Sequence, residues 1–449
     1  MNHLAYVFER FPSFTQTFCV REILELERQG MRPLVFSIRD TRLEEESQKH
    51  FPPDLYERVH FLPQDDELVE EVKRMKAEGK LPQSVVLTLR HWSDHGDRAD
   101  KRRVHEAAYI GVMLQEAGVR HAHSHFAGIG ARTCWWLKFF YDITYSFTGH
   151  ANDLFCKNDF EITLARLMGD AELVVTVSDY TVRDLQRRFP ESAGKVKRVY
   201  NGLNLEPFRE AGQRRDEDAV WHGERLIFSV GRLIEKKGFD DLVRACALMR
   251  DNGVRDFRCV IVGDGPLEEE LRQLIEAKGI GDCVDLAGPK SQDEIIAYLE
   301  RAAIFALPCV TEKDGGKDNL PTVIMEAMGA RVPCVSTILA GVPEMVIDGE
   351  TGSLVGERQP EDFAKAMAEV LADKERAIAM GIAGEQRAVE IFAKEVTARQ
   401  MRRLQVSRGL VRFDARLLAN DPVLVICYIR QWVKRFFRLF GRQKKDRIG

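Results

Sequence analysis

The sequence has no long apolar run, and its first residues do not have the pattern of a leader segment. No apolar stretch reaches the roughly 18 residues that a membrane-spanning helix needs. The first ten residues have neither a basic start nor a long apolar core. We therefore expect the chain to begin with a strand and not with a signal peptide, and we expect no membrane-spanning helix.

Cysteine pairs are also missing. The nine cysteines are scattered, none forms a C-x-x-C pair, and no group of residues has the spacing of a metal site. Most cysteines lie in apolar runs, so we expect small buried side chains in a reducing compartment. We expect neither a disulfide framework, nor a bound metal, nor a resident cofactor.

Charge is unevenly distributed along the chain of 449 residues, whose formal net charge is −4. Residues 401–449 hold thirteen Lys or Arg and three Asp, a balance of +10 that leaves −14 on the other 400 residues. A basic tail on an acidic body indicates an anionic partner, either a nucleic acid or a membrane surface.

At helical spacing, residues 425–442 separate into a basic face and an apolar, aromatic-rich face. Such a helix is typical of a segment lying in a membrane interface; the alternative is a helix docked on the protein's own core. We favour the membrane over both this alternative and nucleic acid, because the charge is of one sign and continues to Lys444 and Lys445. The basic face comprises Arg430, Lys434, Arg435, Arg438 and Arg442.

Strand-like apolar runs alternate with helix-like segments in both halves of the chain. This alternation predicts an α/β protein with two doubly wound, Rossmann-like domains, each a parallel sheet covered by helices. Ligands of such domains lie beyond the strand ends, here in a cleft between the two domains. Ser13 and Gln16 fit a capping box that starts the first helix. We expect domains at 1–205 and 206–390 with a linker in 206–224, returning helices at 391–420, and the tail at 421–449.

The segment from Asp318 to Glu326 combines two carboxylates with a predicted short buried helix. Pro321 suits the first turn of that helix, and Gly329 ends it. A helix N-terminus suits a phosphate, and a carboxylate beside it suits sugar hydroxyls. The alternative is a plain helix with an acidic cap and an exposed Glu326.

Two further loops follow strands in the second half. Arg232 and Lys237 share one of them. The planar guanidinium of an arginine and the compact ammonium group of a lysine together suit a diphosphate; the alternative is that both are ordinary surface charges. Gly263-Asp-Gly265 resembles the start of a dinucleotide fingerprint, but the third glycine is missing.

Histidines mark the first half. His121, His123 and His125 share one face of a predicted strand, which raises the possibility of zinc, although packing or substrate contact at the strand end is the better interpretation. His150 follows another predicted strand and could face Arg232 and Lys237 across the cleft.

These motifs resemble the retaining glycosyltransferases of family 4, which have the GT-B architecture. The resemblance is carried in the second half by Phe228-Ser-Val-Gly-Arg-Leu with Lys237-Gly238, Val262-Gly-Asp-Gly-Pro266, Asp318-x7-Glu326 and Gly341-Val-Pro-Glu344. In the first half, Phe11 to Phe18, His123-Ser-His125-Phe and Phe147 to Asp153 are similar to the branch that builds exopolysaccharides of the colanic acid type.

The resemblance implies roles for individual residues. Arg232 and Lys237 would hold the donor diphosphate, Glu326 the ribose, and Asp318 the donor sugar, where the family has Glu. His150 would contact the donor sugar or the reaction centre. The implied donor site also includes Gly231, Gly263, Pro321 and the backbone amides of Asn319 and Leu320, and the implied acceptor site includes Ser13, Phe14, Thr15, His125, Asn152 and Asp153.

We therefore expect a metal-independent, retaining glycosyltransferase that uses a UDP- or GDP-sugar. Its acceptor would be a saccharide, in lipid-linked form, of cell-surface or exopolysaccharide synthesis. The enzyme would lie on the inner face of the cell membrane through residues 421–449, without nucleic acid. The alternatives are a nucleotide-sugar epimerase of the same fold and a non-catalytic, membrane-bound assembly protein.

Overall fold

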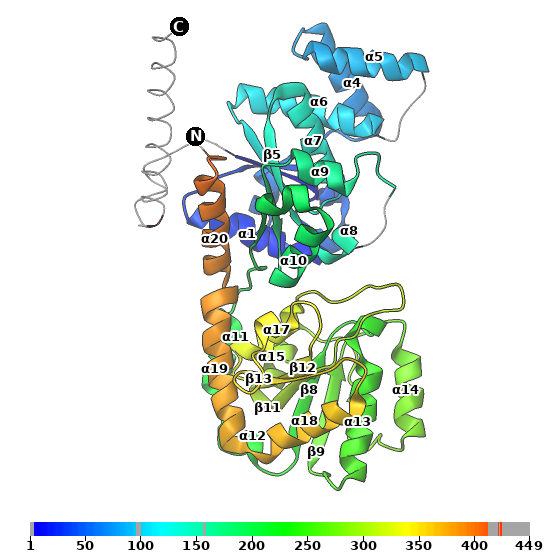
Figure 1. Cartoon of the computed structure of the whole chain (residues 1–449), viewed down its shortest axis with the longest axis vertical. Helices are drawn as coiled ribbons and strands as arrows, with labels where there is room; N and C mark the ends of the chain where they lie inside the picture. Colours follow the sequence, from blue (N-terminus) through cyan, green and yellow to red (C-terminus); the bar gives the residue numbers. More distant parts are fainter. Residues whose placement is uncertain (1–3, 96–99, 156–158, 412–420, 422, 424–449) are drawn as a thin grey trace. The chain divides into compact units, whose positions relative to one another are not determined.

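The computed structural model describes residues 4–95, 100–155, 159–411, 421 and 423 (Figure 1). The chain divides into two units, each built on one parallel sheet with helices, as the alternating pattern predicts. The first unit falls within residues 1–176, 185–202 and 397–449, and the second comprises 177–184 and 203–396. The change of unit at 202/203 lies three residues before the predicted boundary.

The sheet of the first unit has seven parallel strands. Its inner strand β1 is almost wholly buried, because its neighbours β2 and β4 flank it and helices pack on it. The order across the sheet is β3 (Val59–Phe61), β2 (Leu34–Arg39), β1 (Ala5–Arg10), β4 (His121–His125), β5 (Thr144–Gly149), β6 (Leu173–Thr176) and β7 (Val196–Arg198).

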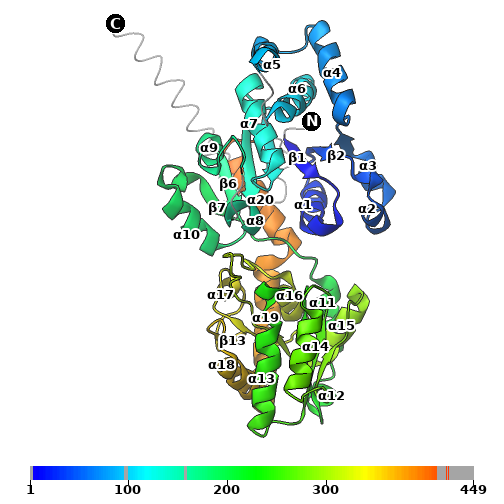
Figure 2. The same ribbon diagram turned by 90° about the vertical axis from the view of Figure 1, so that its right-hand side faces the viewer.

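Helices cover this sheet in two groups. The helix α7 packs on β1, β4 and β5 and contacts α6 and α9, while α1 and α20 share an apolar cluster with β1 and β2 (Figure 2). The helices are α1 (Thr17–Arg28), α2 (Glu45–His50), α3 (Pro53–Glu57), α4 (Asp65–Ala77), α5 (Gln83–His95), α6 (Lys101–Glu116), α7 (Ile129–Tyr141), α8 (Ala151–Phe155) and α9 (Leu164–Asp170). Both units share α10 (Asp179–Arg188) and α20 (Lys394–Ser407).

The second unit has six parallel strands, with β8 and β11 at the centre and buried. Loops that follow the central strands therefore meet at one edge of the sheet. The order is β10 (Val284–Leu286), β9 (Phe257–Val262), β8 (Arg225–Val230), β11 (Ala302–Leu307), β12 (Cys334–Thr337) and β13 (Gly352–Val355).

Two helical layers cover the second sheet. One contains α13, α14 and α18, and the other contains α11, α15, α16 and α19 (Figures 1 and 2). The helices are α11 (Glu206–Arg214), α12 (Glu217–Trp221), α13 (Phe239–Asp251), α14 (Glu268–Ala277), α15 (Gln292–Arg301), α16 (Thr322–Gly329), α17 (Val342–Met345), α18 (Pro360–Ala372) and α19 (Lys374–Phe392). The chain also has short 3-10 helices η1 (Phe14–Gln16), η2 (Thr41–Leu43), η3 (Pro190–Lys195) and η4 (Glu235–Lys237).

Two local predictions are wrong. Residues 206–224 form no linker, because Phe208, Ala211 and Gly212 bury one side of α11 against α15 and α16. The capping box at Ser13 is absent, since Ser13 makes no side-chain cap and the helix α1 begins only at Thr17, after the turn η1.

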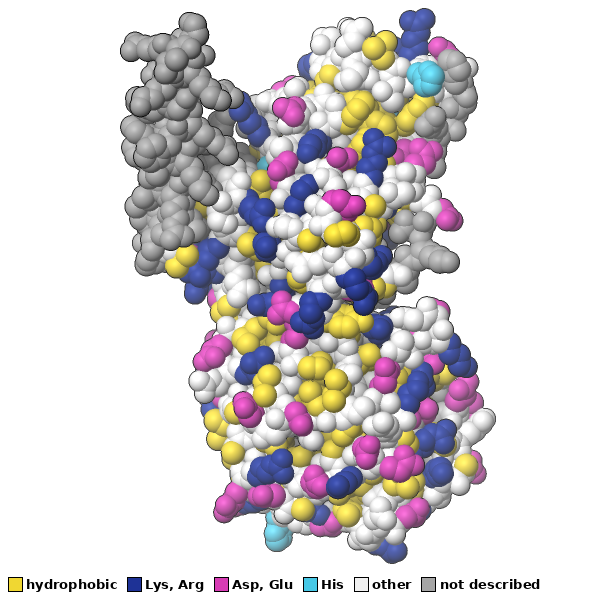
Figure 3. Space-filling view, in the orientation of Figure 1, with side chains coloured by type: hydrophobic (Ala, Val, Ile, Leu, Met, Phe, Trp, Pro, Cys, Tyr) yellow, Lys and Arg dark blue, Asp and Glu magenta, His cyan; other side chains and the backbone are white. Residues whose placement is uncertain are grey.

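The surface of both units mixes positive and negative side chains (Figure 3). Among the residues that the structure describes, no helix combines the length and the apolar character needed to cross a membrane. The predicted amphipathic helix at 425–442 lies outside the described residues.

Candidate functional site

The predicted donor-site residues meet at the carboxyl ends of β8, β9 and β11 in the second unit. Backbone hydrogen bonds join the loops after β8 and β9. Gly231 N–H donates to the Val262 carbonyl at 2.9 Å, and Leu233 N–H donates to the Asp264 carbonyl at 2.7 Å. The loop that carries Lys237 is therefore fixed by its neighbour, as a preformed binding site requires.

Two glycines allow these loops to approach closely. Gly263 has φ +139°, and a Cβ there would lie 1.9 Å from the Gly231 carbonyl oxygen. Gly238 has φ +66°, and a Cβ there would lie 1.9 Å from the Pro308 carbonyl oxygen. Any side chain at either position would force the loops apart, which is the physical reason for glycine there.

Lys237 and Asp318 form an ion pair at the centre of this edge. Lys237 Nζ lies 2.5 Å from Asp318 Oδ2, with 12% and 21% of the two side chains exposed. The Lys237 stem packs against Gly231, where a Cβ would come within 3.2 Å of Cε. Asp318 thus reaches the lysine despite its short side chain.

The surroundings keep Lys237 charged. Burial by itself lowers the pKa of Lys237, but the contributions of Asp318, Cys309 and Glu326 together outweigh it, so the pKa is raised above its usual value. Lys237, Asp318 and Glu326 therefore form one electrostatic cluster.

The predicted helix after Asp318 is confirmed as α16. Pro321 is its N-cap, one residue before the predicted position in the first turn, and Gly329 is its last residue. Glu326 is half-buried on this helix, and Leu320 is buried just before it. Arg232, in contrast, is exposed on the loop after β8.

The Asn319 side chain has a structural role that the sequence did not indicate. It is buried, accepts a hydrogen bond from Ser178 Oγ at 2.9 Å, and donates one to Thr181 Oγ1 at 3.0 Å. Gly341 N–H donates to the Asn319 carbonyl at 2.9 Å. The loop before α16 is thereby tied to the start of α10.

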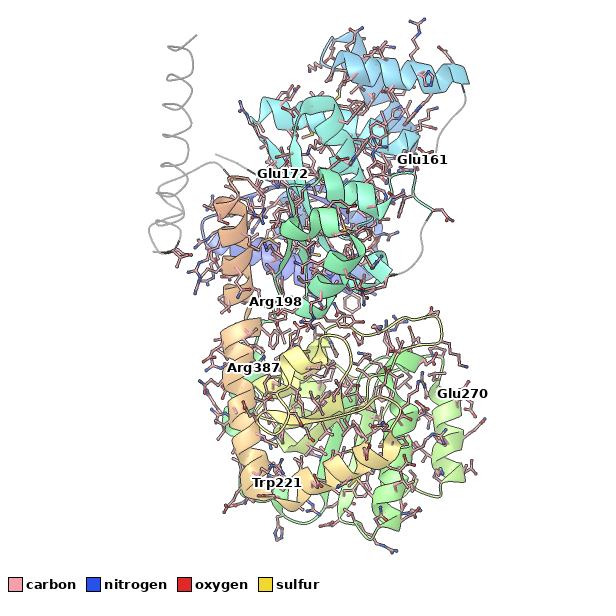
Figure 4. The ribbon with its side chains drawn as sticks, in the orientation of Figure 1. Glu161, Glu172, Arg198, Trp221, Glu270 and Arg387 are labelled. Carbon is pink, nitrogen blue, oxygen red and sulfur yellow. The ribbon has the colours of Figure 1, made fainter. Side chains whose placement is uncertain are left out.

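Glu344 reinforces the same connection. Its carboxylate accepts the backbone N–H groups of Asp179 and Tyr180, both at 2.7 Å, at the N-terminus of α10. Arg387, labelled in Figure 4, donates to the carbonyls of Glu344 and Met345 at 2.6 and 2.9 Å. These bonds hold α17 and the first turn of α10 in the second unit.

The predicted acceptor residues near the N-terminus lie in the first unit, around η1. Ser13 is buried, and its Oγ lies 3.2 Å from Thr15 Oγ1. Phe14 is 47% exposed, and the centroids of its ring and the His50 ring lie 4.7 Å apart in a T-shaped arrangement. Phe14 and Thr15 are thus the side chains of this group that face solvent.

The strand β4 carries a ladder of buried histidines. His121 lies 2.8 Å from both Thr144 Oγ1 and Ser146 Oγ, and His123 lies 2.8 and 3.0 Å from Ser146 Oγ and Thr148 Oγ1. Burial lowers the pKa of His121 to about 3 and that of His123 well below its usual value. These two imidazoles are neutral packing groups.

His125 departs from this pattern. Its Nδ1 lies 3.3 Å from His150 Nε2, and its Nε2 lies 3.3 Å from Glu22 Oε1. Glu22 in turn accepts a hydrogen bond from the Tyr6 hydroxyl at 2.8 Å. The structure therefore brings the two predicted residues His125 and His150 together and adds Glu22, which the sequence analysis missed.

Asp153 organises the turn after His150. Its carboxylate accepts the backbone N–H of His150 at 2.9 Å and also that of Ala127. Burial raises the pKa of Asp153 to about 7. Asn152 lies in α8, and its side chain is outside the described part of the chain.

Glu22, His123 and His125 place three potential metal ligands within 4.8 Å of one another. Both ring nitrogens of His123 already have hydroxyl partners within 3.0 Å. The donor set therefore fits a hydrogen-bonded ladder better than a zinc site.

Comparison with known families assigns both halves of the chain. Residues 15–207 match Glycosyltransferase Family 4, and residues 213–387 match Glycosyl transferases group 1.

Two relatives illustrate the similarity in sequence. The putative colanic acid biosynthesis glycosyltransferase WcaL of Escherichia coli K12 is 43% identical over 146 residues, covering 32% of this chain and 35% of WcaL. The GDP-mannose-dependent alpha-(1-6)-phosphatidylinositol monomannoside mannosyltransferase of Mycobacterium tuberculosis H37Rv is 36% identical over 229 residues, covering 50% and 59%. The chain thus aligns with about a third of WcaL and under two thirds of the mannosyltransferase.

A solved structure shares the fold. Anabaena Alr3699/HepE, crystallised with UDP, superposes with a TM-score of 0.64 at 17% identity over 90% of this chain and 100% of HepE. At this identity the likeness shows the architecture alone.

Proposed function

The chain belongs to the glycosyltransferases of the family 4 type with the GT-B fold, and on this premise we propose that it transfers a sugar from a nucleoside-diphosphate sugar to a saccharide acceptor. The pathway would be exopolysaccharide or another cell-surface glycan, as the names of relatives such as WcaL indicate. The Lys237–Asp318 ion pair beside Glu326 is the observation that carries the proposal.

This cluster has the charges that the reaction needs. Glycosyl transfer breaks the bond between the sugar and a diphosphate, so negative charge grows on the leaving group while the sugar becomes cationic. Lys237, kept protonated, and Arg232 on the same loop stabilise the diphosphate. Glu326 accepts hydrogen bonds from the ribose hydroxyls, because a carboxylate can accept two at once.

Donor binding requires Asp318 to change partners. Without donor, its carboxylate neutralises Lys237 at 2.5 Å. When the diphosphate occupies the lysine, Asp318 turns to the hydroxyls of the donor sugar, and the ion pair is exchanged for two charge-assisted contacts to the ligand. The unliganded pair thus keeps two partly buried charges compensated until the donor arrives.

Transfer would proceed without metal, since cationic side chains take the place of a metal at the leaving group. The likeness to family 4 supports retention of configuration at the sugar. Both uracil and guanine are candidates for the base of the donor nucleotide, since HepE was crystallised with UDP and the mycobacterial relative uses GDP-mannose.

The basic tail, residues 421–449, would hold the enzyme on the inner face of the cell membrane, near a lipid-linked acceptor.

A donor panel tests the proposal. The full-length protein is incubated with UDP- and GDP-sugars with and without EDTA, and thermal unfolding and slow donor hydrolysis are measured. One nucleotide sugar should raise the unfolding temperature and be hydrolysed equally in EDTA. Stabilisation by none of them, or hydrolysis that stops in EDTA, would contradict the proposal.

A separate experiment tests the tail. The full-length chain should sediment with vesicles containing anionic lipid at low salt and remain in solution with neutral vesicles. Removal of residues 422–449 should abolish sedimentation while leaving donor hydrolysis unchanged. A truncated chain that still sediments would refute membrane binding through the tail.

A further inference from the structure

We infer that Glu22 is a positioning residue that acts through His125 to hold His150 in a single protonation and tautomeric state. The role of this chain in sugar transfer rests on the proposed function. The state of the three side chains can be tested without any substrate.

The three side chains form a continuous contact chain in the first unit. Glu22 Oε1 lies 3.3 Å from His125 Nε2, and His125 Nδ1 lies 3.3 Å from His150 Nε2. Both histidines are buried, with 3% and 9% of their surfaces exposed. Each ring nitrogen of His125 therefore faces one member of the chain.

Neighbouring groups fix both ends. The Tyr6 hydroxyl donates to Glu22 at 2.8 Å, and Gln405 Nε2 on α20 donates to the Tyr6 oxygen at 3.2 Å. At the other end, the ring centroids of Phe18 and Phe126 lie 4.8 and 4.6 Å from the ring centroid of His150. Glu22 and His150 are thus held by residues from several different elements.

The comparison along β4 separates this arrangement from ordinary packing. His121 and His123 place both ring nitrogens against Ser and Thr hydroxyls, which can donate or accept and so impose no charge. His125 instead faces a carboxylate on one side and an imidazole on the other. It is the histidine of this strand that an acidic partner can hold in the cationic form.

The titratable groups that face His125 are Tyr6 on β1, Cys19 and Glu22 on α1, His123 on β4 and His150 after β5. Burial raises the pKa of Tyr6, and it lowers the pKa of His123 and His150, so these three are neutral near pH 7. Burial also raises the pKa of Cys19, whereas the adjacent His125 lowers it. Glu22 is the carboxyl group of this set.

His125 itself is held in the protonated form. Burial lowers its pKa, but contacts with Cys19 and Glu22 outweigh burial and raise the pKa well above the usual value. Of these two contributors, Glu22 places a carboxylate oxygen 3.3 Å from His125 Nε2, and a carboxylate at this distance favours the imidazolium.

The proton on His125 determines the tautomer of its neighbour. As an imidazolium, His125 donates its Nδ1–H to His150 Nε2, which leaves the single proton of His150 on Nδ1. If His125 were neutral with its proton directed at Glu22, its Nδ1 could only accept, and His150 would carry its proton on Nε2. Glu22 therefore selects a His150 whose Nδ1–H can donate to a ligand oxygen, such as a sugar hydroxyl.

Histidine nitrogen shifts measured on the ¹⁵N-histidine-labelled, full-length protein test this directly. Near pH 7, we expect His125 as an imidazolium and His150 as the neutral tautomer with its proton on Nδ1, with signals assigned through His125→Gln and His150→Gln. Glu22→Gln should remove the imidazolium signal. Glu27→Gln, which removes another carboxylate of α1 that pairs with Arg58, should leave it. A neutral His125 in the wild type, or an imidazolium that survives in Glu22→Gln, overturns the inference.

Activity supplies an independent readout. Because the active form needs a cationic His125, Glu22→Gln should move the alkaline limb of the kcat profile down by about 1–3 pH units, and Glu22→Asp should restore most of it. An unshifted limb in a folded Glu22→Gln protein would overturn the role in catalysis. If the wild type transfers no sugar at all, the proposed function fails, whereas the nitrogen shifts still decide the charge state of His125.

Discussion

The two units hold their candidate functional groups in different ways. In the second unit, Lys237 and Asp318 form an ion pair of opposite charges, partly exposed at the loops that end neighbouring strands. In the first unit, the half-buried Glu22 contacts the buried His125, which contacts the buried His150. The first arrangement is suited to exchange one partner for a ligand, and the second to keep its own geometry.

This difference has a consequence for mutation. Removing one member of the ion pair should change ligand affinity strongly, because water and the ligand compete for the remaining charge. Removing a member of the buried ladder should change stability and protonation, because no water can replace the missing partner.

The largest effect is expected from Lys237→Ala. The loss of the cation at the leaving diphosphate should lower kcat about 10²–10³-fold, as for the removal of one donor to a developing anion. Steady-state kinetics with the donor identified in the panel measure it. Lys365→Ala, which removes a lysine paired with Glu369 on the surface of α18, is the matched control and should keep full activity. Equal kinetics for both variants would remove Lys237 from the site.

Asp318→Asn separates binding from transfer. With the competing carboxylate neutralised, the free nucleoside diphosphate should bind Lys237 more tightly, by about threefold to tenfold. The contact to the donor sugar is weakened, so kcat/KM should fall about 10–100-fold. Calorimetry and kinetics on the same preparation give both numbers. If nucleotide affinity and kcat/KM both rose, or both fell, the result would argue against a partner exchange.

A third prediction concerns the buried histidines of β4 and the stability of the protein at acidic pH. His121 has a pKa of about 3 in the folded protein, against about 6.5 unfolded. Between these two pKa values the unfolded chain binds a proton that the folded protein does not. The free energy of unfolding therefore decreases as the pH falls, by about 2 kcal/mol at pH 5. His121→Asn should therefore lose less stability between pH 7 and pH 5 than the wild type.

Chemical unfolding at the two pH values measures this difference. His222, which is on the surface between α12 and β8, offers the control substitution His222→Asn. That variant should follow the wild type at both pH values. An acid sensitivity of the His121→Asn protein equal to that of the wild type would contradict the assignment of His121 as a neutral packing group.

The smallest effect is expected from Glu344→Gln. The amide keeps an acceptor oxygen for one of the two N–H groups at the start of α10 but loses the negative charge at the helix N-terminus, which should lower stability by about 1 kcal/mol. Thermal unfolding of the full chain measures it. Unchanged stability would show that the two 2.7 Å bonds contribute nothing to holding α10.

The same contrast explains what the sequence could predict. Asp318 and Glu326 are joined by one loop and one short helix, and Arg232 and Lys237 share a loop, so their proximity follows from local spacing. The meeting of these loops follows from the parallel sheet, whose strand ends lie at one edge. The proximity of the proposed donor-site residues could therefore be predicted from the sequence.

The contacts among Glu22, His125 and His150 could not be predicted from local spacing. Glu22, Tyr6 and Gln405 come from α1, β1 and α20, and only tertiary packing brings them to His125. A glutamate in an amphipathic helix carries no local signal of an inward contact. The helix α11 was missed for a related reason, because Phe208 and two small residues, Ala211 and Gly212, are a weak periodic signal in a charged segment.

The central claim is that the Lys237–Asp318–Glu326 cluster binds a nucleoside diphosphate without metal. Isothermal titration of UDP and GDP into the wild type and Lys237→Ala, in buffer with EDTA, tests it most directly. We predict that one nucleotide binds the wild type and binds the variant at least about tenfold more weakly. Equal affinity for both proteins, or binding by neither nucleotide, would contradict the account.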